Sequence, residues 1–191
     1  MADESKSHEL TAREVRGLAH PIRVKLLRLL RDGPATATGL AKKLGESSGV
    51  TSWHLRQLAE YGFVEEDTER GTKRERWWRS RYPSTSLTDI DLLTSDDPNV
   101  DVFLYSIATD DFDAVTRYIS ERRNWPKKWV SSSTISRATL SLTAAEAKEF
   151  VERMHELIDS FDRPKRKGDK QYHVSAQAFP VRMDLDSRVD E

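Results

Sequence analysis

The feature that most constrains the fold of this chain is a change in hydrophobic period at Gly62. Before this glycine, apolar residues recur every three or four positions, which is typical of amphipathic helices. The helical segments are 10–34, 36–45 and 47–61. Pro21 is expected to begin a second helix inside the first segment. After Gly62, residues 63–82 place strand formers around a charged centre, which predicts a β-hairpin with Gly71 at or near its tip.

The order of these elements is helix, helix, turn, helix, hairpin, which is that of a winged helix-turn-helix domain. Local signals support each boundary, because Thr36 and Ser47 are suited to cap two helices and Gly45 to terminate the one between. We therefore expect an α+β fold, with a winged helix-turn-helix domain at residues 10–82 that follows a flexible tail at residues 1–9.

The polar residues 83–97 are expected to form a linker, and residues 98–191 a small α+β module for dimerisation or effector binding. In this module Asp97 and Pro98 are placed to start a long helix with an apolar stripe. Its members are Val100, Phe103, Leu104, Ile107, Val115 and Ile119. A strand around 138–142, a helix at 143–161 with a continuous apolar core face and a strand at 172–183 complete the expectation.

The chain has 191 residues and no cysteine, so disulfides, thiolate metal ligands and cysteine nucleophiles are excluded. Its five histidines show no metal-ligand spacing, and we expect neither a metal nor another cofactor. No apolar run reaches the roughly 18 residues of a membrane span, and the N-terminus lacks a secretory pattern. We therefore expect a cytoplasmic protein without a membrane partner.

The near-neutral net charge hides an asymmetry between the two halves of the chain. Residues 1–82 carry 16 Lys and Arg against 12 Asp and Glu, whereas residues 83–191 carry 15 against 20. The hairpin is the most basic part, since residues 70–81 hold six basic side chains and only Glu75 as an acid. Such density suits contact with DNA phosphates; the alternative is a solvated edge strand protected by charge.

Angular placement at about 100° per residue divides the helix at 47–61 into two faces. Thr51, Leu55 and Leu58 form the buried face, and Trp53 points directly away from it. In a helix-turn-helix this outward face enters the DNA major groove. Trp53 would then contact a thymine methyl or a sugar, or it packs on the hairpin or on a partner subunit. The DNA-binding candidates are Ser48, Gly49, Ser52, Trp53, Arg56, Arg70, Lys73, Arg74 and Arg76.

Three pieces of the sequence resemble the ArsR-type winged-helix transcriptional regulators over about residues 10–82. They are LAHPIR at the junction in the first segment, the spacing of LAKKLG to VTSWHLRQL, and GFVEE at the start of the hairpin. The resemblance implies a prokaryotic DNA-binding regulator of transcription, usually a homodimer and often a repressor. Metal-sensing members commonly carry a cysteine pair in the helix that matches residues 36–45, and this chain has none.

The partners expected are thus double-stranded DNA, a second copy of the chain and an effector of unknown identity. The helix that starts at Pro98 is the candidate dimer surface, and Trp125 and Trp129 are candidates to line an effector pocket, although anchoring a loop is the simpler role for them. An enzyme is not expected, because the chain has no nucleophile elbow, phosphate-binding glycine loop or H-E-x-x-H motif. The alternative function is a winged-helix protein-interaction adaptor whose C-terminal module binds a small ligand or a protein.

Overall fold

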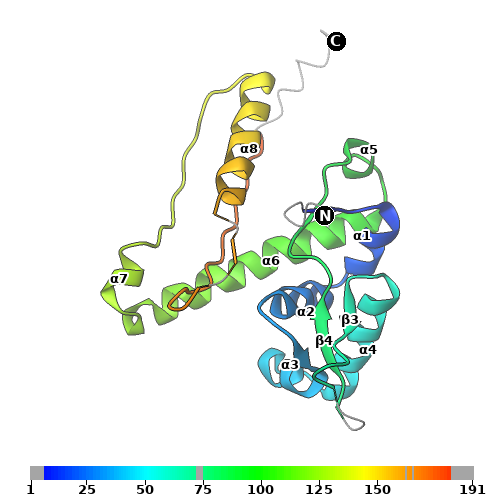
Figure 1. Cartoon of the computed structure of the whole chain (residues 1–191). Helices are drawn as coiled ribbons and strands as arrows, with labels where there is room; N and C mark the ends of the chain where they lie inside the picture. Colours follow the sequence, from blue (N-terminus) through cyan, green and yellow to red (C-terminus); the bar gives the residue numbers. More distant parts are fainter. Residues whose placement is uncertain (1–6, 72–74, 162, 165, 182–191) are drawn as a thin grey trace. The chain divides into compact units, whose positions relative to one another are not determined.

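A computed structural model of the chain describes residues 7–71, 75–161, 163–164 and 166–181. The chain divides into two compact units, Met1–Val130 and Ser131–Glu191. The first unit contains a helical group, a small sheet and a long helix, as Figure 1 shows.

Four helices open the first unit where the periodicity predicts them. They are α1 (Ala12–Leu18), α2 (Pro21–Arg31), α3 (Ala37–Leu44) and α4 (Ser48–Glu60). A capping box between Thr11 and Glu14 starts α1, and Pro21 occupies the first turn of α2. The His20 side chain caps α2, because its Nδ1 accepts the backbone N–H of Ile22 at 3.2 Å. Local signals therefore define these helices before any tertiary contact is made.

The hairpin belongs to a three-stranded antiparallel sheet. Its strands are β2 (Ala35–Thr36), β3 (Val64–Glu66) and β4 (Trp77–Ser80), in the order β2-β4-β3. The register pairs Glu65 with Arg79 and Thr36 with Trp77. Trp78 is buried and Trp77 half-buried, so one indole of this pair packs on the helices, as alternation along a strand predicts.

The core of the first unit is apolar and draws on every helix from α1 to α4 and on β3 and β4. Its central side chains are Leu18, Leu26, Leu30, Leu40, Leu55, Leu58, Phe63 and Trp78. Burial of such aliphatic and aromatic side chains is the main source of stability in a domain of this size. This core fixes how α4 and the hairpin lie against each other.

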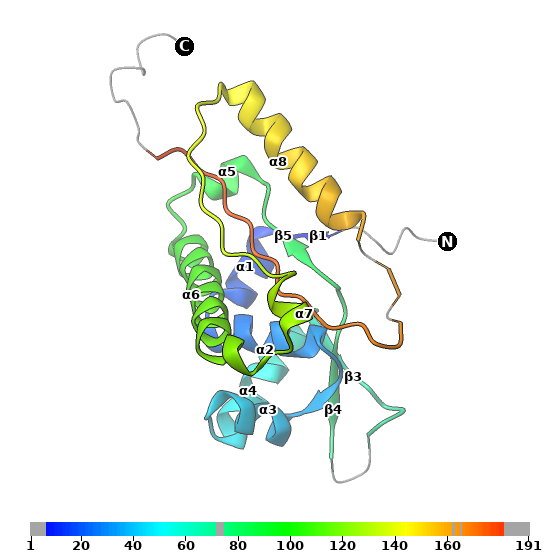
Figure 2. The same cartoon turned by 90° about the vertical axis from the view of Figure 1, so that its left-hand side faces the viewer.

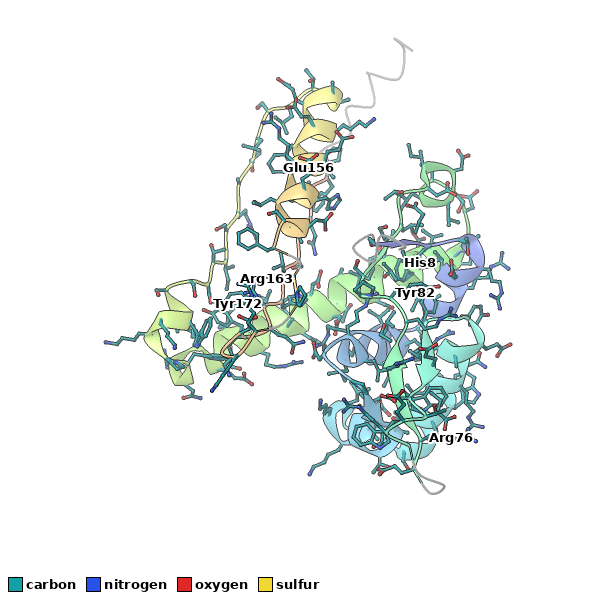
Figure 3. The ribbon with its side chains drawn as sticks, in the orientation of Figure 1. His8, Arg76, Tyr82, Glu156, Arg163 and Tyr172 are labelled. Carbon is teal, nitrogen blue, oxygen red and sulfur yellow. The ribbon has the colours of Figure 1, made fainter. Side chains whose placement is uncertain are left out.

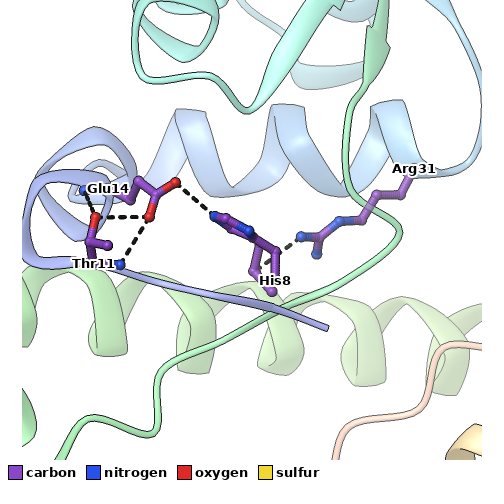
Figure 4. A network of polar contacts seen from close by, with 5 residues as sticks. His8, Thr11, Glu14 and Arg31 are labelled. Carbon is purple, nitrogen blue, oxygen red and sulfur yellow. Dashed lines mark hydrogen bonds and ion pairs between the residues drawn. The ribbon is translucent and has the colours of Figure 1, made fainter. Parts of the chain in front are cut away.

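The end of the expected flexible tail and part of the expected linker pair as strands in the first unit. His8 and Glu9 form β1 (His8–Glu9), which runs parallel to β5 (Thr85–Ser86). The His8 ring stacks on Tyr82 at 3.9 Å, as Figure 3 allows one to follow. The His8 Nε2 lies 2.7 Å from Oε1 of Glu14, and the other carboxylate oxygen, Oε2, accepts from the backbone N–H and the hydroxyl of Thr11 (Figure 4). The N-terminal segment and residues 83–97 therefore hold each other in place.

The remaining helices of this unit follow the same segment. They are α5 (Ile90–Leu93), α6 (Pro98–Glu121), the 3-10 helix η1 (Arg122–Asn124) and α7 (Lys127–Val130). The long helix α6 runs beside α1 and α2 (Figure 2) and buries Val100 and Phe103 against them. Two ion pairs of 2.6 Å join α2 to α6, one between Lys25 and Asp113 and one between Arg28 and Asp110. The compact unit thus extends beyond the boundary expected at residue 97.

The described residues of the second unit contain one helix, α8 (Ala144–Asp159), with a capping box between Thr143 and Glu146. The expected strands at 138–142 and 172–183 are wrong over the part of them that is described, because residues 138–142 and 172–181 form no strand. None of the described residues of this unit is buried, so the apolar face of α8 is exposed rather than a core. Alternating side chains predict a strand only when a partner strand completes its hydrogen bonds, and neither segment has one here.

No helix in the described parts of the chain is both long enough and apolar enough to cross a membrane.

Candidate nucleic-acid interface

The turn between α3 and α4 fixes the direction in which α4 leaves the core. Gly45 ends α3 in a left-handed conformation with φ of 70°, which a residue with a Cβ rarely adopts. Ser47 then caps α4, and its hydroxyl oxygen accepts the backbone N–H of Val50 at 3.2 Å. A short turn with two strong caps holds the helix pair rigid.

The two faces of α4 lie as the angular placement predicts. Thr51, Leu55 and Leu58 are completely buried, whereas Trp53 is 52% exposed and Arg56 is exposed. Ser48 and Gly49 are exposed at the N-terminal end of the helix, and Ser52 is half-buried on its shoulder. The sequence therefore identifies the solvent-facing side of this helix correctly.

Trp53 continues an aromatic row that begins at the junction of α1 and α2. The ring centroids of His20 and His54 lie 4.4 Å apart. The rings of His54 and Trp53 make a T-shaped, edge-on contact, with centroids 4.8 Å apart. The pKa of His20 is lowered, chiefly by burial and then by the charge of Arg23. The pKa of His54 is lowered to about 4, chiefly by burial and then by the charges of His20 and Arg23. His54 is therefore neutral at pH 7 and acts as an apolar support beneath the indole.

A cleft of about 390 Å³ separates α4 from the N-terminus of α3 and from the hairpin. It brings together three of the candidate residues, Ser52, Arg56 and Arg76, with the buried Trp78 at its wall. The sequence interpretation missed three other polar residues of the cleft, which are Thr36, Thr38 and Glu75. A sequence signal for the two threonines was present, because Thr36 and Thr38 lie at the predicted start of the helix that precedes the turn.

Arginines of the hairpin make ion pairs with the acidic residues of β3. Arg79 lies 2.7 Å from Glu65 across the ladder, and Arg81 lies 3.8 Å from the same carboxylate. The acidic residues of β3 thus neutralise the arginines at the end of the hairpin nearest the core, so the net positive charge of the hairpin lies towards its tip. Such exposed pairs contribute at most about 1 kcal/mol each.

Towards the tip, the hairpin arginines are more exposed, and neither described ion pair is as short as that of Arg79. Arg76 lies 3.8 Å from Glu66 and Arg70 lies 3.4 Å from Asp67, and both side chains are more than 60% exposed. Arg76 is labelled near the end of the hairpin in Figure 3. Lys73 and Arg74 lie outside the described residues. The described arginines are therefore accessible to an anionic partner beside the exposed face of α4.

The fold and the position of this surface define a winged helix-turn-helix protein. A family model described as "Helix-turn-helix domain" matches residues 18–67, which contain α2, α3, α4 and β3. Residues 18–67 therefore match a helix-turn-helix domain, which agrees with the resemblance of the sequence to ArsR-type regulators. No curated protein matches the chain.

Three solved structures are similar to the chain at low sequence identity. A homodimeric winged helix-turn-helix DNA-binding domain of Mb0332 from Mycobacterium bovis, a possible ArsR-family regulator, is 22% identical over 53% of this chain and 79% of its own, with a TM-score of 0.33. An apo mutant of Lactococcus lactis ZitR is 15% identical over 75% and 84%, with a TM-score of 0.33. The adhesin competence repressor AdcR of Streptococcus pyogenes is 13% identical over 72% and 80%, with a TM-score of 0.32. The fold assignment rests on the family model and the element order rather than on these overall likenesses.

Proposed function

We propose that the protein is a sequence-specific DNA-binding regulator of transcription that acts as a homodimer and represses the genes whose operators it covers. The observation that carries the proposal is the cleft in which Ser52 and Arg56 of α4 meet Arg76 of the hairpin, on the helix that also exposes Trp53. In this proposal α4 enters the major groove with its N-terminal residues nearest the bases, and the hairpin contacts the adjacent backbone. Such a regulator would work in the cytoplasm of a prokaryotic cell.

The candidate residues divide into two groups by the contact proposed for them. Ser48, Ser52 and Arg56 carry hydroxyl and guanidinium groups that can recognise base edges, and Gly49 permits a close approach. Arg70 and Arg76, together with Lys73 and Arg74, carry charges suited to phosphates. The proposal gives sequence preference to the first group and general affinity to the second.

The proposed homodimer forms through the exposed face of α6, on the side away from α1 and α2. The stripe expected from the sequence does not lie on one face, since Val100 and Phe103 are buried on α1 and α2 whereas Ile119 is exposed. Two residues outside that stripe, Tyr105 and Phe112, lie with Ile119 on the opposite side. The three follow one another at seven-residue intervals and are 74%, 70% and 44% exposed. A seven-residue apolar repeat suits packing against a second helix. Two α4 helices related by a two-fold axis would then read half-sites roughly 10 bp apart.

The test is the selection of bound duplexes from a random DNA pool by the full-length protein, followed by affinity measurements over a range of salt concentrations. We expect an inverted repeat, and an affinity that falls steeply with salt because counterions are released from the phosphates. Arg56→Ala should change the preferred sequence, whereas Arg76→Ala should weaken all sequences about equally. Salt-independent binding, or no enrichment from the pool, would contradict the proposal and leave the protein-binding adaptor as the better interpretation.

A further inference from the structure

The first unit contains a second cleft, about 560 Å³ in volume and separate from the α4 surface. Its wall is made by residues from three helices that are far apart in the sequence. They are Lys25, Arg28 and Leu29 of α2, Lys43 and Leu44 of α3, and Arg117 of α6. None of these six residues is acidic. The volume lies within the roughly 300–1,000 Å³ of small-molecule sites.

Two of the four cations in this cleft are neutralised by α6 and two are not. Lys25 pairs with Asp113 and Arg28 pairs with Asp110, each at 2.6 Å. Within the described parts of the chain, Lys43 and Arg117 form no side-chain ion pair. The cleft therefore has an uncompensated positive charge on two different helices, α3 and α6.

Asp113 lies within the electrostatic influence of three of these four cations. Its carboxyl pKa is lowered, first by the hydrogen bond from Lys25 and its charge, and further by the charges of Arg117 and Arg28. Asp110 and Asp113 offset two of the four positive charges at the cleft, which leaves two for a bound anion to offset. Leu29 and Leu44 add apolar surface to the wall of the cleft. A bare inorganic ion would not cover this surface, which would then stay in contact with water.

We propose that this cleft is the binding site for a small organic anion, a carboxylate or phosphate attached to an apolar body. Arg117 offers the planar pair of donors that a carboxylate or phosphate accepts in two hydrogen bonds, and Lys43 offers a point charge from the opposite side. The apolar body of the ligand then packs on Leu29 and Leu44. The two uncompensated cations set the charge of the ligand, and the two leucines select against simple salts.

The position of the cleft makes such a ligand an effector, and this part rests on the proposed function. A ligand held between Lys43 and Arg117 links α3, the first helix of the helix-turn-helix, to α6, the proposed dimer helix. Any difference in ligand affinity between the free and the DNA-bound dimer must appear as an equal change in DNA affinity.

The experiment is a calorimetric titration of the full-length protein with phenyl phosphate, in the absence of DNA. We expect saturable binding with a Kd below about 1 mM and weaker binding of inorganic phosphate, which lacks the apolar body. The double variant Lys43→Gln with Arg117→Gln should lose at least about tenfold in affinity. The matched control is Lys42→Gln, an exposed lysine on the same helix that does not line the cleft; it should bind as the unmodified protein does.

Equal binding of phenyl phosphate to the unmodified protein and to the double variant, or no saturable binding, would overturn the site. A double variant that loses DNA affinity without any phenyl phosphate binding by the unmodified protein would assign these cations to the DNA backbone instead, and would also overturn it. Because the titration contains no DNA, failure of the proposed DNA binding leaves its result intact. Melting temperatures close to that of the unmodified protein verify that both variants are folded.

Discussion

Trp53 and Trp78 place the same side chain in two different environments. Trp78 is 8% exposed and packs in the core, whereas Trp53 is 52% exposed and rests against the ring of His54. An exposed indole has a large apolar surface and one N–H donor, which suits contact with a groove wall or with a partner protein. The difference in burial separates a side chain that stabilises the fold from one available for binding.

Trp53→Ala should therefore reduce DNA affinity by at least about tenfold, if the indole contacts the groove, with little change in melting temperature. Trp78→Ala should instead cost about 3–5 kcal/mol in the free energy of unfolding, because it leaves a large cavity. Affinity by fluorescence anisotropy and stability by urea denaturation measure the two effects separately. If Trp53→Ala lowered stability and affinity together, the indole would be a packing residue.

The buried histidine beneath Trp53 makes stability depend on pH. The folded pKa of His54 is about 4, lowered chiefly by burial, while an unfolded histidine has a pKa of about 6.5. The unfolded chain therefore binds a proton more readily, so the free energy of unfolding should fall as pH decreases from about 6.5 towards 4. Urea denaturation across this range should show a shallower dependence for His54→Leu. His155→Leu, which replaces an exposed histidine on α8, should retain the full dependence.

The sequence predicts the faces of α4 more accurately than the surroundings of its histidine. Angular placement depends only on helix geometry, so the outward direction of Trp53 follows from the spacing alone. The buried face given by that placement is Thr51, Leu55 and Leu58, yet His54 is also only 4% exposed. Its ring contacts that of His20, 34 positions earlier in the chain, and a contact of this kind has no local signal.

At the scale of elements, a glycine allows α1 and α4 to pack closely. A Cβ atom added at Gly17 would lie 2.5 Å from Cγ of the Tyr61 ring, which is closer than real contacts allow. Tyr61 follows the last turn of α4, and the guanidinium of Arg13 lies over its ring at 5.2 Å. The contact therefore holds the C-terminal end of α4 against α1.

Gly17→Ala should lower the free energy of unfolding by about 1–3 kcal/mol, because the ring of Tyr61 must move. Gly49→Ala is the matched control, since no heavy atom lies closer than 3.9 Å to a Cβ at that position. It should be neutral or stabilising by up to about 1 kcal/mol, as expected for alanine in a helix. Equal losses in the two variants, measured by urea denaturation, would show that the contact with Tyr61 does not control stability.

Elements defined by short-range signals were predicted well, and those that depend on distant partners were not. The hairpin follows from a glycine-containing turn between two strands, which are close in sequence. The third strand, Ala35–Thr36, is only two residues long and exists because β4 lies beside it. Likewise, β5 at Thr85–Ser86 depends on β1 at the start of the chain, so residues 83–97 resembled a linker in sequence.

At the scale of the whole molecule, the exposed stripe on α6 and the surface on α4 require each other under the proposed function. Tyr105, Phe112 and Ile119 form an apolar repeat on a helix whose other face is buried on α1 and α2. One α4 helix contacts only one half-site, and a dimer roughly adds the free energies of two. Loss of the dimer should therefore weaken binding to an inverted repeat far more than binding to a half-site.

Phe112→Glu tests this coupling, because it places a charge in the centre of the stripe. The side chain is 70% exposed in the single chain, so the substitution should leave the fold intact. In a dimer the carboxylate would be buried without a partner, which costs several kcal/mol, and light scattering should detect a monomer. Ile90→Glu on α5, at a position that is 73% exposed, is the control and should stay dimeric. If Phe112→Glu remained a dimer with unchanged affinity for the inverted repeat, the two copies would have to meet through a surface other than this stripe.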